Sequence, residues 1–326
     1  MKMIAVLVLL ALQAPSSKGP VKVFILAGQS NMQGQGALKT IDWLGKHPTQ
    51  GQLLKRLKNE DGSWNVREDV WVYYPRDSKT LKKGNLTAGY GADDQKIGPE
   101  WTFGHVVGDR FENQVLLIKT AWGGKSLAVD FRPPSSGGTA GPSYTEMIAI
   151  VRECLKNLAH HFPGYDGRGY ELAGFAWFQG WNDLINKDRV AEYEANLVNL
   201  IKDVRREFGA PNLPFVIGEL GVGGEESSKK NPSMAAIRKA QAAPAERPEF
   251  KGTVACVATS KYWDHEAEDF LDKHWVKRKW DSEESKAEFE KMGTQPEYHY
   301  LGSARIFALI GLGLGEAMVS LCGKKE

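Results

Sequence analysis

The chain has 326 residues, of which 42% are hydrophobic, and its 42 Lys and Arg residues nearly balance its 40 Asp and Glu residues. A net charge of +2 supplies no strongly basic surface, so composition argues against nucleic-acid binding. The 10 Trp, 10 Tyr and 13 Phe residues exclude a disordered chain, because so much apolar surface requires a packed core. Three cysteines cannot form a disulfide framework, and we expect buried free thiols.

The first 17 residues have the pattern of an export signal. Lys2 is followed by an apolar run over residues 3–12 and then by small residues around Ser16 and Ser17. The run is shorter than the ~20 apolar residues that a membrane-spanning helix needs. We therefore predict a signal peptide over 1–17 and a secreted or periplasmic protein.

Five short apolar runs alternate with longer segments of helical period. The continuous apolar character of the runs favours strands buried on both faces, and the alternation predicts a mostly parallel five-stranded sheet with helices on both faces. The strands are expected at 21–27, 114–120, 174–179, 215–218 and 253–258. The helices are expected at 99–110, 144–161, 189–208, 233–243 and 303–321.

The remaining long segments are rich in loops and charges. We interpret residues 38–97 and 261–296 as insertions that decorate a single domain spanning 18–326. The apolar stretch 306–318 is interrupted by three glycines, Gly311, Gly313 and Gly315, which indicates a packed helix with a small-residue face. No membrane span is therefore expected after the signal is removed.

Residues suited to ester hydrolysis follow the predicted strands. In a parallel sheet the ligand lies beyond the carboxyl ends of the strands. Ser30 follows the first strand, a Gly123-Gly124 pair follows the second, and Gln179 follows the third. A late histidine, His299, precedes the last helix, and a serine with a histidine base is the pairing that nucleophilic acyl transfer needs.

The segment Leu26-Ala27-Gly28-Gln29-Ser30-Asn31-Met32 resembles the nucleophile block of SGNH-type esterases. The resemblance is to the sialate O-acetylesterase and acetylxylan esterase-like group, carbohydrate esterase family 6. The order of the later blocks, Gly123-Gly124, Gln179-Gly180 and His299, is similar as well, so that the likeness extends over roughly 21–318.

This resemblance implies a three-layer α/β/α sandwich and deacetylation of a sugar hydroxyl without metal or cofactor. Ser30 would be the nucleophile and His299 the general base. The oxyanion hole would consist of the Ser30 backbone N–H, an N–H of Gly123 or Gly124, and the Gln179 side chain.

The third member of the triad departs from the family pattern. An aspartate is usual three residues before the histidine, and Pro296 occupies that position. Glu297 is the nearest replacement, and a backbone carbonyl that orients the imidazole is the alternative. Three more distant candidates are Asp264, Asp269 and Asp272.

Several side chains near these motifs are candidates for substrate binding. Trp122 and Trp181 are expected to face the cleft, where aromatic rings pack against sugar rings. Asp130 and Arg132 could contact sugar hydroxyls or brace their own loop. Asn182 and Asp183 could support Gln179 or the serine loop. The full set of candidate substrate-binding residues is Gln29, Asn31, Trp122, Asp130, Arg132, Trp181 and Asn182.

We therefore predict a secreted serine esterase that removes O-acetyl groups from carbohydrate through an acyl-enzyme. Its expected partner is an acetylated glycan, with sialic acid, xylan and other sugars all open. The alternatives are a non-catalytic glycan-binding protein with the same fold and a serine esterase for a non-carbohydrate acyl ester.

Overall fold

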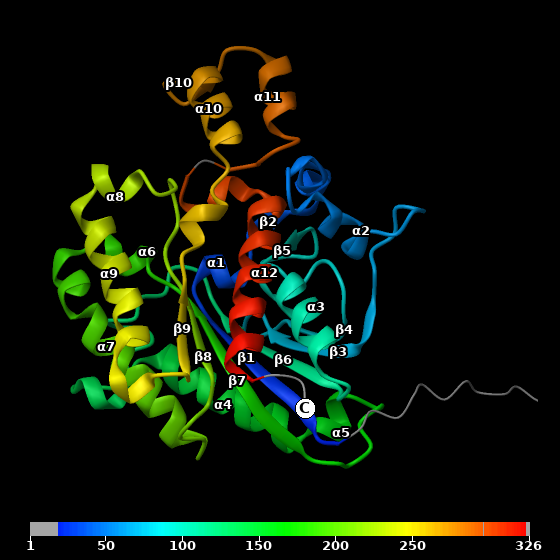
Figure 1. Ribbon diagram of the computed structural model, residues 1–326. Helices are drawn as coiled ribbons and strands as arrows, with labels where there is room; N and C mark the ends of the chain where they lie inside the picture. The colour runs from blue at the N-terminus through cyan, green and yellow to red at the C-terminus, as the bar shows by residue number, and fades with distance from the viewer. Residues whose placement is uncertain (1–18, 296, 324–326) are drawn as a thin grey trace, which may run out of the picture.

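The computed structural model describes residues 19–295 and 297–323, so that the signal peptide predicted over 1–17 lies outside the described part. The described chain forms a seven-stranded sheet in the order β4-β3-β6-β1-β7-β8-β9 (Figure 1). All neighbouring strands are parallel except the edge pair β3 and β4. The strands are β1 (Val21–Gly28), β3 (Arg67–Pro75), β4 (Leu81–Leu86), β6 (Val115–Ala121), β7 (Tyr170–Phe178), β8 (Phe215–Gly218) and β9 (Val254–Val257).

All five predicted strands are present, and the sheet is larger than expected by two strands. β3 and β4 come from the segment that the sequence analysis treated as an insertion. Only Val70–Tyr74 of β3 is buried, and charged residues before and after it hide this short run in the sequence. β3 joins the sheet by pairing in parallel with β6, and β4 closes that edge.

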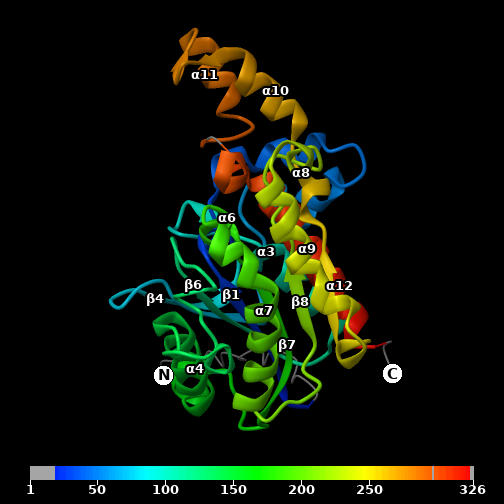
Figure 2. The same cartoon turned by 90° about the vertical axis from the view of Figure 1, so that its left-hand side faces the viewer.

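Helices cover both faces of the sheet, which gives the expected three layers (Figures 1 and 2). α3 packs against α12 on one face, and α4 and α7 lie on the other, with α9 against α7. The longer of the described helices are α3 (Glu100–Arg110), α4 (Pro142–Lys156), α7 (Lys187–Glu207), α9 (Pro232–Glu246), α10 (His265–His274) and α12 (Ala304–Leu321). Two short helices carry candidate site residues, α1 (Ser30–Gln33) and α6 (Trp181–Leu184). The short helices are α2 (Leu54–Leu57), α5 (Leu158–His161), α8 (Ser227–Lys230) and α11 (Glu283–Phe289).

α12 is a core helix. It is long and apolar enough to cross a membrane by length and composition, but two thirds of it is buried inside the molecule. A side chain at Gly311 would meet the Pro99 carbonyl oxygen at 2.1 Å, and one at Gly315 would meet Val106. The glycines therefore allow α12 to approach α3, as the small-residue pattern predicted.

The second predicted insertion forms an arm that projects from the body (Figures 1 and 2). The arm consists of α10, a two-stranded ladder of β10 (Trp275–Val276) and β11 (Lys279–Trp280), and α11. The arm stands at the end of the molecule where β1 ends and α12 begins (Figure 1). Cys154, Cys256 and Cys322 are all free thiols, as expected, but only Cys154 is buried and the other two are partly exposed.

Candidate active site

Ser30 occupies the centre of the carboxyl edge of the sheet. β1 lies between β6 and β7 and ends at Gly28, whose φ is +153° and where a side chain would meet the Phe178 carbonyl oxygen at 2.1 Å. Only glycine fits this close approach. Ser30 then begins α1 with its side chain largely buried, and its N–H belongs to the first turn of a helix, where backbone donors lack intrahelical partners.

His299 is brought to the serine by the segment before α12. This segment is the 3-10 helix η6 (Glu297–Gly302), in which Tyr300 and Leu301 have φ of 51° and 59°. Such positive values are rare for large side chains and hold the chain in a tight reversal. The Asn31 amide donates to the Tyr298 carbonyl at 3.2 Å, which ties the residue after Ser30 to the residue before His299.

The His299 ring is oriented by an amide. Its Nδ1 lies 2.7 Å from the Gln295 Oε1, an oxygen that can only accept a hydrogen bond. Nδ1 therefore carries the proton, and Nε2 keeps the lone pair that a general base needs. The sequence analysis did not predict Gln295, because it looked for a carboxylate near His299. The signal available in the sequence was a side chain that can accept a hydrogen bond, four residues before the histidine.

The imidazole is held in its neutral form. Burial, followed by the positive charge of Lys96, lowers the pKa of His299 from 6.5 to about 4. Lys96 itself is paired with Asp93 at 2.9 Å. At neutral pH, His299 is thus deprotonated and able to accept a proton.

The carboxylates proposed as triad acids have different outcomes. Glu297 opens η6, but its side chain lies outside the described part, as does Pro296, so that its role stays a prediction. Asp264 is wrong as the triad acid: it is buried, accepts from the Trp43 indole at 2.7 Å and pairs with Arg305 at 3.1 Å. A carboxylate paired in this way braces the base of the arm and is not available to His299.

The glycine pair lies beside the nucleophile. A β-carbon built on Gly123 would lie 3.9 Å from the Ser30 Cβ and 3.4 Å from the Gln33 Oε1. Gly124 has a φ of +73°, and its carbonyl accepts from the Asn182 amide at 2.8 Å. The backbone of this turn therefore passes next to Ser30, as an oxyanion loop must.

Gln179 points inward, which differs from the donor role that the resemblance implied. Its Nε2 lies within hydrogen-bond distance of the Gln29 Oε1 (3.1 Å), the Lys125 carbonyl (3.0 Å) and the Asp183 Oδ2 (2.6 Å). The amide NH₂ group has two hydrogens, so that all of its donor capacity is used by these three acceptors. The Gln179 amide therefore holds the loops together in this structure.

Gln29, which is buried, and Asn182, which is partly exposed, belong to the same hydrogen-bond network. The Gln29 Oε1 accepts from the backbone N–H groups of Gly180 (3.1 Å) and Asn182 (3.2 Å), and its Nε2 donates to the Asn182 Oδ1 at 3.1 Å. Gln29 therefore fastens the serine loop to the loop after β7. These contacts give it a positioning role, and the substrate contact expected from the sequence stays a prediction.

Asp183 organises the loop that follows the glycine pair. Its carboxylate accepts from the backbone N–H groups of Leu127 (2.8 Å) and Ala128 (2.9 Å) as well as from Gln179. Burial raises the pKa of Asp183, although these hydrogen bonds oppose the shift. Three donors on one buried carboxyl are the mark of a structural anchor.

Asp130 and Arg132 brace their own loop in this structure, and their contact with sugar hydroxyls stays a prediction. The Asp130 carboxylate accepts from the Ser126 N–H and hydroxyl at 2.8 and 2.9 Å. Arg132 donates to the carbonyls of Ala128, Ser136 and Gly137 and pairs with Glu192. Both side chains fold the 123–141 segment back on itself.

The two tryptophans predicted to face the cleft differ in their packing. Trp122 stacks on Phe131 with ring centroids 6.0 Å apart and is half-buried. Trp181 is also half-buried, and its ring lies 5.7 Å from that of Tyr298, the neighbour of His299. Trp181 thus packs against the segment that carries the predicted base.

A buried ion pair fixes the short helix α1, which begins with Ser30. Lys119 and Glu100 are fully buried and 2.7 Å apart. The Lys119 ammonium also donates to the carbonyls of Gln33 and Tyr90 at 2.8 Å. All three of its protons are therefore used, and one of them fixes the end of α1.

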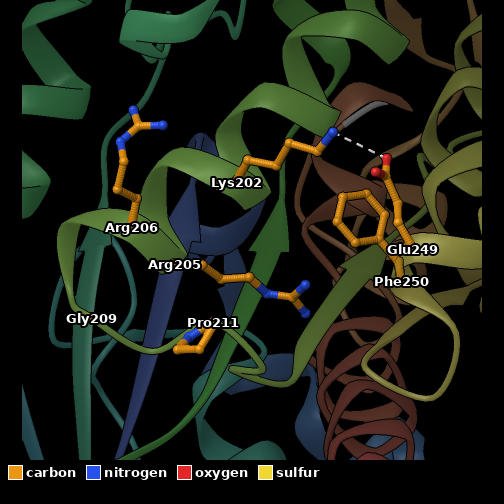
Figure 3. A pocket seen from close by; sticks show the side chains of 7 residues that line it. All are labelled: Lys202, Arg205, Arg206, Gly209, Pro211, Glu249 and Phe250. Atoms are coloured by element: carbon orange, nitrogen blue, oxygen red, sulfur yellow. Dashed lines mark ion pairs between the residues drawn. The ribbon is translucent and has the colours of Figure 1, made fainter.

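A hollow at the opposite edge of the sheet is unrelated to this site. It has a volume of about 510 Å³ and lies where α7 ends, near the amino ends of β8 and β9 (Figure 3). Its Lys202 pairs with Glu249 at 3.2 Å, and its Arg205 donates to the Leu213 carbonyl at 2.9 Å. Ligands of parallel sheets bind at the carboxyl ends of the strands, where Ser30 is. Over the described residues, no group of three or more His, Cys, Asp or Glu side chains gathers as metal ligands do.

Comparison with known families agrees with this geometry. Residues 20–272 match the family described as carbohydrate esterase, sialic acid-specific acetylesterase. The chain belongs to this family. It is therefore a carbohydrate O-acetylesterase, a carboxylic ester hydrolase.

Relatives of known sequence and structure are distant. A probable carbohydrate esterase of Arabidopsis thaliana is 24% identical over 207 residues, which are 63% of this chain and 71% of the plant protein. The X-ray structure of that protein covers 92% of this chain and 98% of its own, at 17% identity and a TM-score of 0.55, and shows the same fold. A carbohydrate acetylesterase from Xanthomonas citri covers 72% of this chain and 49% of its own, at 15% identity and a TM-score of 0.47.

Proposed function

We propose that this esterase works through a covalent acyl-enzyme on Ser30, with His299 as the proton carrier. The observation that carries the proposal is the His299 ring itself. Its Nδ1 is bound to Gln295, its Nε2 is left as a base, and its segment is tied to α1 through Asn31 and Tyr298. Serine and histidine on adjoining segments at the carboxyl edge of a parallel sheet form an acyl-transfer pair.

The steps follow from the positions of these groups. The Ser30 Oγ attacks the acetyl carbonyl carbon while His299 takes the hydroxyl proton. His299 then gives that proton to the sugar oxygen as the bond between this oxygen and the acyl carbon breaks. Water, deprotonated by the same imidazole, then attacks the acetyl-serine. The bond between the acyl carbon and the Ser30 Oγ breaks, His299 returns the proton to this oxygen, and acetate leaves.

Backbone groups are the proposed donors to the oxyanion. The N–H of Ser30 and the N–H of Gly123 are the candidates, because the turn that carries Gly123 passes beside Ser30. Each such donor typically contributes about 3 kcal/mol to the transition state. Gln179, whose amide hydrogens are bonded within the protein, holds this turn through the Lys125 carbonyl.

The test is a comparison of Ser30→Ala with the wild type on p-nitrophenyl acetate and on an O-acetylated glycan. We expect the substitution to lower kcat by at least about 10⁴-fold without unfolding the protein, because the nucleophile is lost while the fold is kept. Circular dichroism checks the fold, and Ser78→Ala, in the exposed turn between β3 and β4, is the matched control. Activity that survives Ser30→Ala would overturn the serine mechanism.

We also propose that the protein is exported. Support comes from Lys2 and the apolar run over 3–12, which have the composition of a signal peptide. Mass spectrometry of the protein from its own cells should show an N-terminus near residue 18. An intact Met1 in the accumulated protein would contradict export by cleavage.

A further inference from the structure

A second cavity lies next to the catalytic segment. It has a volume of about 280 Å³ and is bounded by the loop after β7, the loop after β8, α9 and the arm. Sites for small molecules occupy roughly 300–1,000 Å³, so this cavity suits a single ring. The side chains that matter for its chemistry are Trp181, Trp263, Trp275, Leu271, Glu268 and Asp272.

The cavity adjoins the site of reaction through shared residues. Trp181 lines it and also packs against Tyr298, whose ring lies 4.4 Å from that of His299. Leu301, two residues after His299, lines it as well. A glycan whose acetyl group reaches Ser30 can therefore place a neighbouring sugar in this cavity.

The lining has the chemistry of a sugar subsite. Three tryptophans line the cavity, and aromatic rings are the side chains that pack against the C–H groups of a sugar. Glu268 is held in place because it accepts from the Trp263 indole at 2.7 Å and from His265 at 3.1 Å. Carboxylate oxygens accept hydrogen bonds from hydroxyl groups, so Glu268 and Asp272 can bind the ring hydroxyls.

The charge of the lining narrows the choice of sugar. Among the described residues that line the cavity, the charged ones are Glu268 and Asp272, and none is Lys, Arg or His. A carboxylated sugar placed there would face two negative charges, and like charges in a partly enclosed site repel. We propose that this cavity is a subsite for a neutral sugar ring adjacent to the acetylated one. This inference rests on the proposed function of Ser30 and extends it to the substrate.

The first experiment measures acetate release from a neutral acetylated disaccharide and from p-nitrophenyl acetate. Trp275→Ala should raise KM for the disaccharide about tenfold, because one aromatic face is lost, and leave kcat/KM for p-nitrophenyl acetate unchanged. Trp280→Ala is the matched control: Trp280 pairs with Trp275 across the β10 and β11 ladder but packs against Phe289 and does not line the cavity. It should change neither value.

The second experiment tests the charge. The wild type should deacetylate the neutral disaccharide with a higher kcat/KM than one whose unacetylated sugar carries a carboxylate, and Asp272→Asn should narrow the difference severalfold. Equal rates on the two sugars, or a Trp275→Ala effect that is the same on the disaccharide and the small ester, would overturn the subsite. If the wild type released no acetate from any of these substrates, the proposed function itself would fail, which is a different result.

Discussion

At the scale of single residues, the unusual feature of the site is an amide where serine hydrolases place a carboxylate. Gln295 can orient His299, but it brings no negative charge to stabilise the imidazolium. Burial and Lys96 act in the same direction, and together they lower the pKa of His299 to about 4. The proposed base, His299, is therefore neutral down to about pH 5.

This arrangement predicts an acid-tolerant pH profile. His299 must be deprotonated to accept the Ser30 proton, so kcat/KM falls as pH drops through its pKa. We expect kcat/KM for p-nitrophenyl acetate to stay level down to about pH 5 and to halve near pH 4, whereas an ordinary histidine would give a midpoint near 6.5. Lys96→Gln removes one cause of the lowered pKa and should move the midpoint upward by about half a unit.

The matched control is Lys79→Gln, which removes the same charge from the exposed turn between β3 and β4. It should leave the midpoint where it is. A wild-type midpoint near 6.5, or a Lys96→Gln profile that coincides with the wild type, would contradict this account of the base. Circular dichroism at each pH separates loss of activity from unfolding.

Sequence reasoning was most successful for the residues whose chemistry admits few substitutes. Ser30 and His299 were chosen for their chemistry, and the structure places them on adjoining segments. Gln295 was missed because many side chains can accept a hydrogen bond, so only the contact of Gln295 with His299 in the structure reveals the partner. The roles of Gln29 and Asp130 were equally hidden, since a polar side chain in a loop can face the ligand or the loop itself.

At the scale of elements, the site depends on two loops that hold each other. The loop after β7 supplies Gln179 and Asp183, and the loop after β6 supplies the N–H groups of Leu127 and Ala128. Asp183 connects the two loops. The position of the Gly123 turn beside Ser30 therefore depends on a buried carboxyl that does not touch the substrate in this scheme.

We predict that Asp183→Asn lowers both stability and turnover. An amide NH₂ in place of one carboxylate oxygen would face backbone N–H groups, and a buried donor left unpaired costs about 1–3 kcal/mol. The displaced loop should lower kcat more than it raises KM, because it carries the proposed oxyanion donor. Thermal unfolding and steady-state kinetics measure the two effects, and Asp188→Asn, in the first turn of α7, is the control. Unchanged kcat in Asp183→Asn would show that this loop does not shape the oxyanion site.

Elements were predictable where burial is continuous along the chain. β1 and β6 are buried on both faces, and their apolar runs are visible without any other information. β3 is buried over only five residues, and it begins with charged residues that are partly or fully exposed to solvent. The pairing of β3 with β6 depends on residues more than 40 positions apart, which no local pattern records.

At the scale of the whole molecule, the arm is an addition to the central sheet, although its Ala267, Leu271 and Phe289 pack into the hydrophobic core. None of the seven strands of the described sheet comes from residues 265–289. The arm is joined to the body near Asp264 and through the ion pair of Lys39 with Glu290. It supplies Glu268, Leu271, Asp272 and Trp275 to the proposed subsite and nothing to the Ser30 and His299 pair.

Because the arm lines the proposed subsite and does not carry Ser30 or His299, the effect of removing it can be predicted. Replacing residues 266–288 with a short glycine–serine linker should leave kcat/KM for p-nitrophenyl acetate within about twofold, because the seven-stranded sheet is kept. It should lower the unfolding midpoint by several degrees, because Ala267 and Leu271 are lost from the hydrophobic core. KM for the acetylated disaccharide should rise at least as much as in Trp275→Ala. The control replaces Lys277 and Arg278, whose φ values of 54° and 62° fit a type I′ turn, with Asn-Gly. That variant keeps the arm and loses its charged tip, so it should behave as the wild type on both substrates; a loss of small-ester activity in the linker variant alone would show that the arm shapes the catalytic pair as well.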